Sequence, residues 1–370
     1  MKLLIDLSYV EELPVGVVLY ALRIIRGMHD NGVKDICLFL NPKTAEAIHQ
    51  EFPEYDYVIA PEKRVVRIPR VWLQLLVDGY RYQQAMKRID CDIIFSPFHP
   101  IFTFWKMKKK HVRTFHDLFQ LNATSTVWRI GAHLTILRMI KNADAIIIIS
   151  NHVKNEILKR YKLIAKKNVK TIYNAIEFGT ETDNISPLVE YNYILYVNSL
   201  SESKNIITLL KAFDIIKHKI PHKLIFLGKK TAYFMEVLKP YIDQHELADR
   251  VVHMERVSDK ELISLYQHAS LFVTSSLLEG FGFTPIEAAM CNTPVISTKE
   301  AALYETTMGL LHYYEPPMDH QALATKIMEV LQNPPSQEEL EKISSSFKEQ
   351  YNNRKIAKEV YEFITSVYES

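Results

Sequence analysis

The sequence predicts an α/β protein of two doubly wound, Rossmann-like domains, each with a parallel sheet. Short apolar runs alternate with longer amphipathic ones, and the alternation breaks once, near 177–188, before it restarts. The break has the Gly, Pro and polar composition of a linker. The length of 370 residues also suits two domains better than one. Unbroken apolar strands alternating with helices indicate parallel sheets covered on both faces.

The first domain is expected over residues 1–182. Its first strand candidate, 3–5, is followed by a loop through Gly16 and a helical pattern over 17–28, which Asn31-Gly32 ends. Further apolar strand candidates lie at 36–40, 93–95, 112–115, 146–149 and 169–172.

The second domain is expected over residues 183–348. Strand candidates lie at 193–197, 223–227, 271–274 and 294–297, with a helix at 206–216. Ser258 and Glu261 form a capping-box pattern that opens another helix, ending near His268. Residues 349–370 include an amphipathic helix, with apolar spacing from Ile356 to Val367.

Composition excludes several classes of protein. The net charge of only +2 does not point to nucleic acid. Three widely separated cysteines argue against a disulfide framework and fit a reducing compartment. No apolar run approaches the ~18 residues of a spanning helix. Asp6 interrupts the apolar start, which is unlike a signal peptide. A cytoplasmic protein is expected.

A glycine-containing loop with a carboxylate at each end follows the apolar run at 271–274. Glu279 and Glu287 flank it, and a helix is expected to begin at Pro285, a residue favoured at the first helical position. Ligands bind at the carboxyl ends of strands in open α/β sheets. A helix N-terminus suits phosphate, and carboxylates accept hydrogen bonds from hydroxyls. Phosphate and hydroxyls together indicate a nucleotide sugar.

Glu287 also has a structural interpretation. Thr284 and Glu287 fit a second capping box, with Thr284 as N-cap. Glu279 lies before that cap and has no such role, so the functional interpretation of the pair is favoured.

Several segments in a fixed order resemble a known family. They are 194–205, 279–287, 291–296 with Glu305, 116–118, 150–156 and 173–177. In order and spacing they resemble the retaining glycosyltransferases of the GT-B fold, the group 1 or family four class. The resemblance implies two Rossmann-like domains facing across a cleft, the first binding the acceptor and the second the nucleotide sugar. It also implies that the helix within 349–370 packs back on the first domain.

The resemblance assigns donor-side roles to residues of the second domain. Glu287 would accept hydrogen bonds from the ribose, and Glu279 would contact the donor sugar. Lys204 would neutralise the diphosphate that leaves during transfer. The remaining donor-binding residues would be Phe281, Gly282 and Phe283, through their backbone N–H groups, and Ser199, Asn205 and Gly228.

In the first domain the resemblance points to His116 and Gly16. His116 would face the donor sugar, although an ordinary strand-end histidine is the alternative. Gly16 would mark the loop for the acceptor or a phosphate. That loop has one glycine where the family often has more.

One departure concerns the diphosphate. Where the family usually has Gly-Arg, this chain has Asn198-Ser199, so one cation is missing. A charge-assisted contact is worth roughly 1.5–3 kcal/mol, and its loss would weaken donor binding by about ten- to a hundredfold. Lys229 and Lys230 are candidate substitutes.

No metal or cofactor is expected. Asp90-Cys91-Asp92 looks like a metal-binding Asp-x-Asp, but it precedes the apolar run at 93–95 and is interpreted as a strand lead-in. Lys204 and a helix dipole would neutralise the leaving group instead.

Two basic segments with aromatic neighbours suggest peripheral contact with an anionic membrane. One runs from Lys106 to Arg113 after Phe104-Trp105, and the other is 64–76. A solvated loop beside a core helix is the alternative.

The sequence therefore predicts a metal-independent, retaining transferase. It would move a hexose-type sugar from a nucleotide diphosphate to a glycan or lipid-linked acceptor in surface polysaccharide or glycolipid synthesis. The alternative is a non-catalytic sugar-nucleotide- or glycan-binding relative that partners an active transferase. An epimerase or phosphorylase of the same fold is a third reading.

Overall fold

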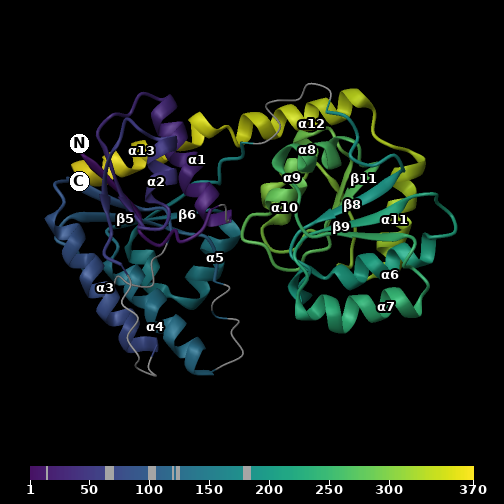
Figure 1. Cartoon of the computed structure of the whole chain (residues 1–370), viewed down its shortest axis with the longest axis horizontal. Helices are drawn as coiled ribbons and strands as arrows, with labels where there is room; N and C mark the ends of the chain where they lie inside the picture. Colours follow the sequence, from purple (N-terminus) through teal and green to yellow (C-terminus); the bar gives the residue numbers. More distant parts are fainter. Residues whose placement is uncertain (14–15, 63–70, 99–105, 119–120, 122–125, 178–184) are drawn as a thin grey trace. The chain divides into compact units, whose positions relative to one another are not determined.

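The computed structural model describes the whole chain except residues 14–15, 63–70, 99–105, 119–120, 122–125 and 178–184, with backbone only at 16–17 and 71–76. It divides into two compact units, Met1–Ala175 with Asn353–Ser370, and Ile176–Asn352. Each unit contains one parallel sheet with helices on both faces (Figure 1), as the sequence predicts. The expected boundary at 182–183 lies outside the described residues.

Unit 1 is built on seven parallel strands in the order β3-β2-β1-β4-β5-β6-β7. The strands are β1 (Leu3–Leu7), β2 (Ile36–Leu40), β3 (Asp56–Ile59), β4 (Ile93–Ser96), β5 (Lys110–Phe115), β6 (Ala145–Ile148) and β7 (Asn168–Thr171). The helices are α1 (Gly16–Asp30), α2 (Ala45–Glu51), α3 (Val71–Arg88), α4 (Thr126–Asn142), α5 (Asn151–Arg160) and α13 (Asn353–Glu369), with a 3₁₀ turn, η2 (Lys162–Lys166). The strands β1, β2, β4 and β6 are buried along their whole length, which is why they read as unbroken apolar runs.

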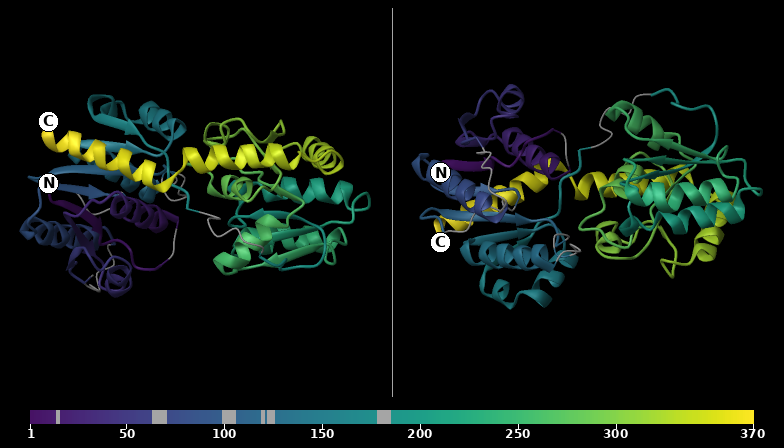
Figure 2. Two further views of the ribbon diagram at one scale, coloured as in Figure 1. Left: turned by 90° about the horizontal axis from the view of Figure 1, so that it is seen from above. Right: turned by 60° about the horizontal axis from the view of Figure 1, so that its bottom comes forward.

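The helix α13 belongs to unit 1 although it follows unit 2 in the sequence. It lies against α1 (Figures 1 and 2), and its apolar face joins the core on that side of the sheet. Gly27 permits this packing, because a Cβ there would lie 2.5 Å from the Cβ of Ala357 and 2.7 Å from the carbonyl oxygen of Asn353.

Unit 2 repeats the arrangement with six parallel strands in the order β10-β9-β8-β11-β12-β13. The strands are β8 (Tyr193–Val197), β9 (Lys223–Leu227), β10 (Val251–Met254), β11 (Leu271–Val273), β12 (Val295–Ser297) and β13 (His312–Tyr313). The helices are α6 (Ile206–Ile216), α7 (Lys239–Gln244), α8 (Asp259–Gln267), α9 (Phe283–Met290), α10 (Leu303–Thr306), α11 (His320–Gln332) and α12 (Gln337–Gln350), with a 3₁₀ turn, η3 (Glu202–Lys204), and a π turn, η4 (Phe234–Leu238). The capping box that opens α8 is confirmed, because Ser258 and Glu261 bond each other's backbone N–H.

The basic segment 106–113 is partly interior: three of its charged side chains are bonded or buried within unit 1, whereas Lys106 and Lys108 are exposed. Arg113 is fully buried in β5. Lys110 Nζ donates to the Val367 carbonyl at 2.9 Å, and Lys109 Nζ donates to the Ile89 carbonyl at 2.6 Å. The aromatic residues before this segment, and 63–70 of the other one, lie outside the described residues.

The acidic pair before β4 is a strand lead-in, as predicted. The Lys2 backbone N–H donates to Asp92 Oδ2 at 2.7 Å, and the Asp92 N–H donates to the Lys2 carbonyl at 2.8 Å. Asp90 pairs with Lys2 Nζ at 3.6 Å. Within the described parts of the chain, no group of three His, Cys, Asp or Glu side chains is placed to hold a metal ion.

Candidate functional site

The candidate site lies where the strand order of unit 2 reverses. The strands β8 and β11 are neighbours there, although β9 follows β8 in the sequence. The loop after β8 and the loop after β11 are bonded to each other: Ser275 Oγ donates to the carbonyls of Lys204 and Asn205 at 3.1 and 3.0 Å, and the Leu277 N–H donates to the Ser203 carbonyl at 3.2 Å. In open α/β sheets this switch point is where ligands bind.

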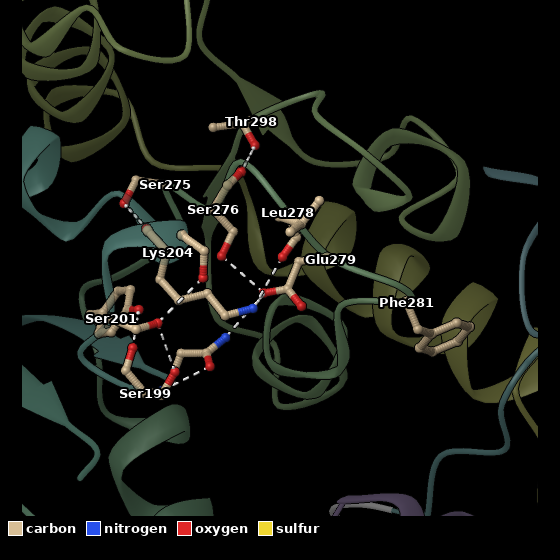
Figure 3. Close-up of polar contacts among 12 residues, drawn as sticks. Ser199, Ser201, Lys204, Ser275, Ser276, Leu278, Glu279, Phe281 and Thr298 are labelled. Atoms are coloured by element: carbon tan, nitrogen blue, oxygen red, sulfur yellow. Dashed lines mark hydrogen bonds and ion pairs between the residues drawn. The ribbon is translucent and has the colours of Figure 1, made fainter. Parts of the chain in front are cut away.

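Glu279, in the loop after β11, and Lys204, in the loop after β8, form an ion pair (Figure 3). Lys204 Nζ donates to Glu279 Oε1 at 2.7 Å and to the Leu278 carbonyl at 3.2 Å. The two side chains are only 13% and 11% exposed, respectively. An ammonium group has three N–H donors. Among the described residues none accepts the third, so Lys204 keeps one donor for a ligand.

The two oxygens of Glu279 have different environments. Besides Lys204, Oε1 accepts from Ser276 Oγ at 2.9 Å and from Asn198 Nδ2 at 3.1 Å. No described residue donates to Oε2. Three donors therefore fix the carboxylate through one oxygen, and the other oxygen is left to accept a hydroxyl.

Asn198 and Ser276 were missed as site residues by the sequence reasoning. In the sequence, Asn198 stands out only as the residue that replaces the glycine of the family's Gly-Arg pair. In the structure its side chain donates a hydrogen bond to Glu279 and accepts one from the Ser199 N–H at 2.8 Å. The available signal was a polar residue shortly after each of two apolar strands, Asn198 directly after β8 and Ser276 three residues after β11.

Three serine hydroxyls follow Asn198 in the first loop. Ser199 Oγ lies 3.2 Å from Ser201 Oγ, which lies 3.4 Å from Ser203 Oγ. Ser199 and Ser203 are exposed. A short chain of hydroxyls thus occupies the position where the resemblance implies an arginine.

Asn205 and Gly228 hold the loop structure. Asn205 Nδ2 donates to the Pro317 carbonyl at 2.9 Å, and its Oδ1 accepts from Thr208 Oγ1 at 2.8 Å. A Cβ at Gly228 would lie 1.9 Å from the Asn198 carbonyl oxygen, so only glycine fits beside this loop.

The helix after the second loop begins earlier than expected. The helix α9 starts at Phe283, with Gly282 as its N-cap in the left-handed conformation (φ 88°), instead of starting at Pro285. Leu303 Cδ2 would lie 2.5 Å from a Cβ at Gly282. The predicted second capping box is therefore wrong, because Thr284 lies inside the helix and Glu287 is its fifth residue. Glu287 instead accepts a hydrogen bond from the Tyr266 hydroxyl at 3.3 Å.

The two phenylalanines of the loop pack against each other in unit 2. Phe281 is buried, with its ring 5.0 Å from Phe283 and 5.3 Å from Tyr351 between centroids. Figure 3 shows its side chain lying apart from the Glu279 cluster. Gly282 and Phe283 form the start of α9, a helix end that suits an anion, and Phe281 directly precedes the N-cap.

His116 lies in unit 1, after the end of β5. Its Nε2 donates to the Pro97 carbonyl at 2.8 Å, and its ring meets Tyr20 edge-on at 4.7 Å between centroids. Burial lowers the pKa of His116 to about 4, so the imidazole is neutral at pH 7. Gly16 is the first residue of α1.

The cysteines are buried free thiols. Burial raises the pKa of Cys37 to about 11 and that of Cys291 to about 12. Such thiols are inert at neutral pH.

Comparison with known proteins covers both units. Residues 14–178 match the family model Glycosyltransferase Family 4, and residues 180–347 match Glycosyl transferases group 1. Over 201 residues the chain is 32% identical to the O-antigen chain mannosyltransferase RfbU of Salmonella typhimurium, covering 54% of each protein. Over 207 residues it is 26% identical to O-antigen chain mannosyltransferase B of Escherichia coli, covering 52% of each. The alignments thus span about half the length of these curated relatives.

Solved structures resemble the whole chain. Sucrose-phosphate synthase of Thermosynechococcus elongatus matches with a TM-score of 0.77 at 18% identity, covering 99% of this chain and 98% of that one. HepE of Anabaena, in complex with UDP and glucose, matches with a TM-score of 0.73 at 16% identity, covering 99% and 100%. At these identities the likeness shows the fold, which is GT-B. With both units matched in order, the chain belongs to the group 1, family four glycosyltransferases.

Proposed function

We propose that this protein transfers a hexose from a nucleotide diphosphate sugar to a glycan or lipid-linked acceptor in surface polysaccharide or glycolipid synthesis. The observation that carries the proposal is the polar cluster at the β8–β11 switch point. It offers a buried ammonium with a spare donor, and a carboxylate with a spare acceptor, side by side. A diphosphate needs the first and a sugar hydroxyl needs the second.

In this proposal the diphosphate is bound with one cation and several neutral donors. Lys204 supplies the cation, Ser199 and its neighbouring serines supply hydroxyls, and the N-terminus of α9 supplies backbone N–H groups and a positive dipole end. Because the negative charge of Glu279 already balances the positive charge of Lys204, the diphosphate would bind at a site of low net charge. Donor affinity should therefore be modest.

Glu279 Oε2 would accept a hydrogen bond from a hydroxyl of the donor sugar. Glu287 would accept hydrogen bonds from the ribose hydroxyls. Transfer would keep the anomeric configuration and require no metal. The bond from the anomeric carbon to the phosphate oxygen breaks, the acceptor oxygen bonds that carbon on the same face, and the departing phosphate takes the acceptor proton. Mannose is the first donor sugar to test, because two matched relatives are named as O-antigen chain mannosyltransferases.

The first test is a thermal-shift screen with GDP-mannose and with UDP-, ADP-, CMP- and dTDP-sugars. A ligand that binds only the folded protein raises its melting temperature. We expect a shift with one nucleotide, lost in Lys204→Ala and Glu287→Ala. It should be retained in Glu338→Ala, a matched control whose side chain is 77% exposed on α12. Donor turnover should then require an acceptor and persist in EDTA.

A gain-of-function variant tests the phosphate assignment. Ser199 is exposed, and its hydroxyl has one described side-chain partner, Ser201, so an arginine can be accommodated there. Ser199→Arg should tighten binding of the nucleoside diphosphate about tenfold or more, because a charge-assisted contact is worth roughly 1.5–3 kcal/mol. Ser199→Gln, similar in length but neutral, is the control. Equal affinities for Arg and Gln would place the phosphate elsewhere.

The second candidate function is a non-catalytic sugar-nucleotide- or glycan-binding partner of an active transferase. Asn198-Ser199 in place of Gly-Arg favours it. A thermal shift without any turnover, in the presence of a glycan or lipid-linked acceptor, would support this reading. Donor turnover without an acceptor would instead indicate an epimerase or phosphorylase.

A further inference from the structure

The helix α4 of unit 1 carries an exposed apolar stripe. Val127, Ile130, Leu134 and Leu137 are 65%, 55%, 54% and 39% exposed. Their spacing of three, four and three residues places them along one face of the helix. The opposite face is also apolar and is buried, through Ile136, Met139, Ile140 and their neighbours.

Such a face is unusual on a soluble protein. A helix that packs on a sheet normally presents charged and polar residues to water on its outer side. Contiguous exposed apolar surface marks a site of contact with a protein, a ligand or a membrane. Trp128, in the first turn, is also 50% exposed. Tryptophan is enriched at membrane–water interfaces.

The charges on and beside the stripe are basic. Arg129, Arg138 and Lys141 are exposed on α4, and the helix contains no acidic residue. The turn η2, which packs against α4, adds Lys162 and Lys166.

A small cavity beside the first turn of α4 continues this charge pattern. Its volume is about 350 Å³, and it is lined by Leu121, Thr126, Arg129, Ile130, His133 and Arg160. Glu156 is already paired with Lys159 and with Arg160 of the cavity lining, and Asp144, just after α4, is paired with Lys106. Basic side chains around an apolar face match an anionic bilayer, where phosphate headgroups lie above the acyl chains.

We propose that α4 is a membrane-docking helix that lies flat on a bilayer containing anionic lipid. Val127, Ile130, Leu134 and Leu137 would enter the boundary between headgroups and acyl chains, while Arg138 and Lys141 contact phosphates. A second copy of the chain is a poorer occupant, because pairing two α4 faces would bring like charges together. Within the described residues no helix is long and apolar enough to cross a membrane, so this contact is peripheral. It differs from the two basic-aromatic segments that the sequence suggested.

The proposal does not depend on the transferase activity, because vesicle binding requires no donor. The full chain would be sedimented with phosphatidylcholine vesicles and with vesicles containing about one-third phosphatidylglycerol. The wild type should bind the anionic vesicles, and this binding should weaken as the salt concentration rises. Ile130→Ser with Leu134→Ser should lose at least tenfold in binding, because a buried leucine or isoleucine contributes about that factor or more.

Charge variants separate the two parts of the surface. Arg138→Gln with Lys141→Gln should lose roughly 30-fold on anionic vesicles, about fivefold per cation. The matched apolar control is Met235→Ser with Met318→Ser, at exposed positions of unit 2. The matched charge control is Lys342→Gln with Lys358→Gln, exposed on α12 and α13. Both controls should bind like the wild type.

Two results would overturn the proposal. One is unchanged vesicle binding in the folded α4 variants, with melting temperatures equal to the wild type. The other is a dimer in sedimentation velocity that the same α4 substitutions dissociate, which would assign the stripe to a second copy of the chain.

Discussion

Glu279 and Lys204 are buried together, and each stabilises the other as an ion. Removing one member of a buried pair leaves an uncompensated charge and costs roughly 3–5 kcal/mol. Asn198 and Ser276 add neutral donors to the same oxygen of Glu279, so its orientation is set before any ligand arrives. A group that is oriented in advance can stabilise a reacting substrate without the free-energy cost of reorganising during the reaction.

The buried histidine of unit 1 gives a pH prediction. The pKa of His116 is about 4 in the folded chain, against about 6.5 in an unfolded one. Between these values the unfolded chain binds a proton that the folded chain excludes, so stability falls as pH drops from 6.5 toward 4. His116→Gln removes this contribution, which is about 2 kcal/mol between pH 7 and pH 5. The melting temperature of the variant should therefore fall less than that of the wild type over this range.

His111 in β5 also has its pKa well below the ordinary value, because it is buried beside Arg113. It remains in both proteins, so it does not affect the difference between them. Parallel pH profiles for wild type and His116→Gln would show that His116 is not the titrating group.

At the scale of elements, the start of α9 decides how the donor loop presents its backbone. Gly282 turns the chain into the helix through a left-handed conformation that L side chains rarely adopt, at a place where Leu303 leaves no room for a Cβ. The helix therefore begins two residues before Pro285, and Thr284 caps nothing. In α8, by contrast, Ser258 and Glu261 satisfy each other's backbone donors.

The two threonine/serine positions give a direct comparison. Ser258→Ala should lower the free energy of unfolding by about 1 kcal/mol, the usual value for losing an N-cap. Thr284→Ala should change it by less than about 0.5 kcal/mol, because alanine is a better helix former than threonine and no cap is lost. Urea unfolding of both variants measures the difference. Equal losses would restore Thr284 as the N-cap.

At the scale of the whole molecule, unit 1 is assembled from both ends of the chain. The helix α13 follows all of unit 2 and returns to cover α1, with Val360 and Ile364 fully buried. Unit 1 therefore completes its core only when residues 353–370 are in place. Stability of the first domain is linked in this way to a segment that follows the whole of unit 2 in the sequence.

The packing of α13 on α1 can be tested by whether Gly27→Ala raises or lowers the free energy of unfolding. Gly→Ala inside a helix normally stabilises by about 1 kcal/mol. Here the new Cβ would overlap Ala357 and the Asn353 backbone, so Gly27→Ala should destabilise by roughly 1–3 kcal/mol, as overpacking does. Thermal unfolding of the full chain gives the change, and hydrogen exchange should show α13 opening first. Ser346→Ala, exposed on α12, is the control and should be neutral or slightly stabilising. A stabilised Gly27→Ala would contradict the close contact.

The sequence by itself determined the elements whose pattern is local. Four elements have the predicted bounds: the strands at 36–40, 193–197 and 223–227 and the helix at 206–216. Their bounds could be predicted because the spacing of apolar residues, and the residues that end an element, are features of a few neighbouring positions. β3, exposed along its length, and β13, two residues long, carry too little apolar pattern to be predicted. Glu279 and Glu287 stood out from the sequence because they flank a glycine-containing loop after an apolar strand, and Lys204 stood out through family resemblance.

Only the tertiary structure decided which partners those residues have. Asn198 and Glu279 are 81 positions apart and meet because β8 and β11 are neighbours, an order that periodicity does not encode. The same holds for the burial of Arg113, which the local sequence presents as one of several surface charges. Local chemistry sets the backbone of each element, whereas the site and the docking helix depend on which faces the packed sheets leave open.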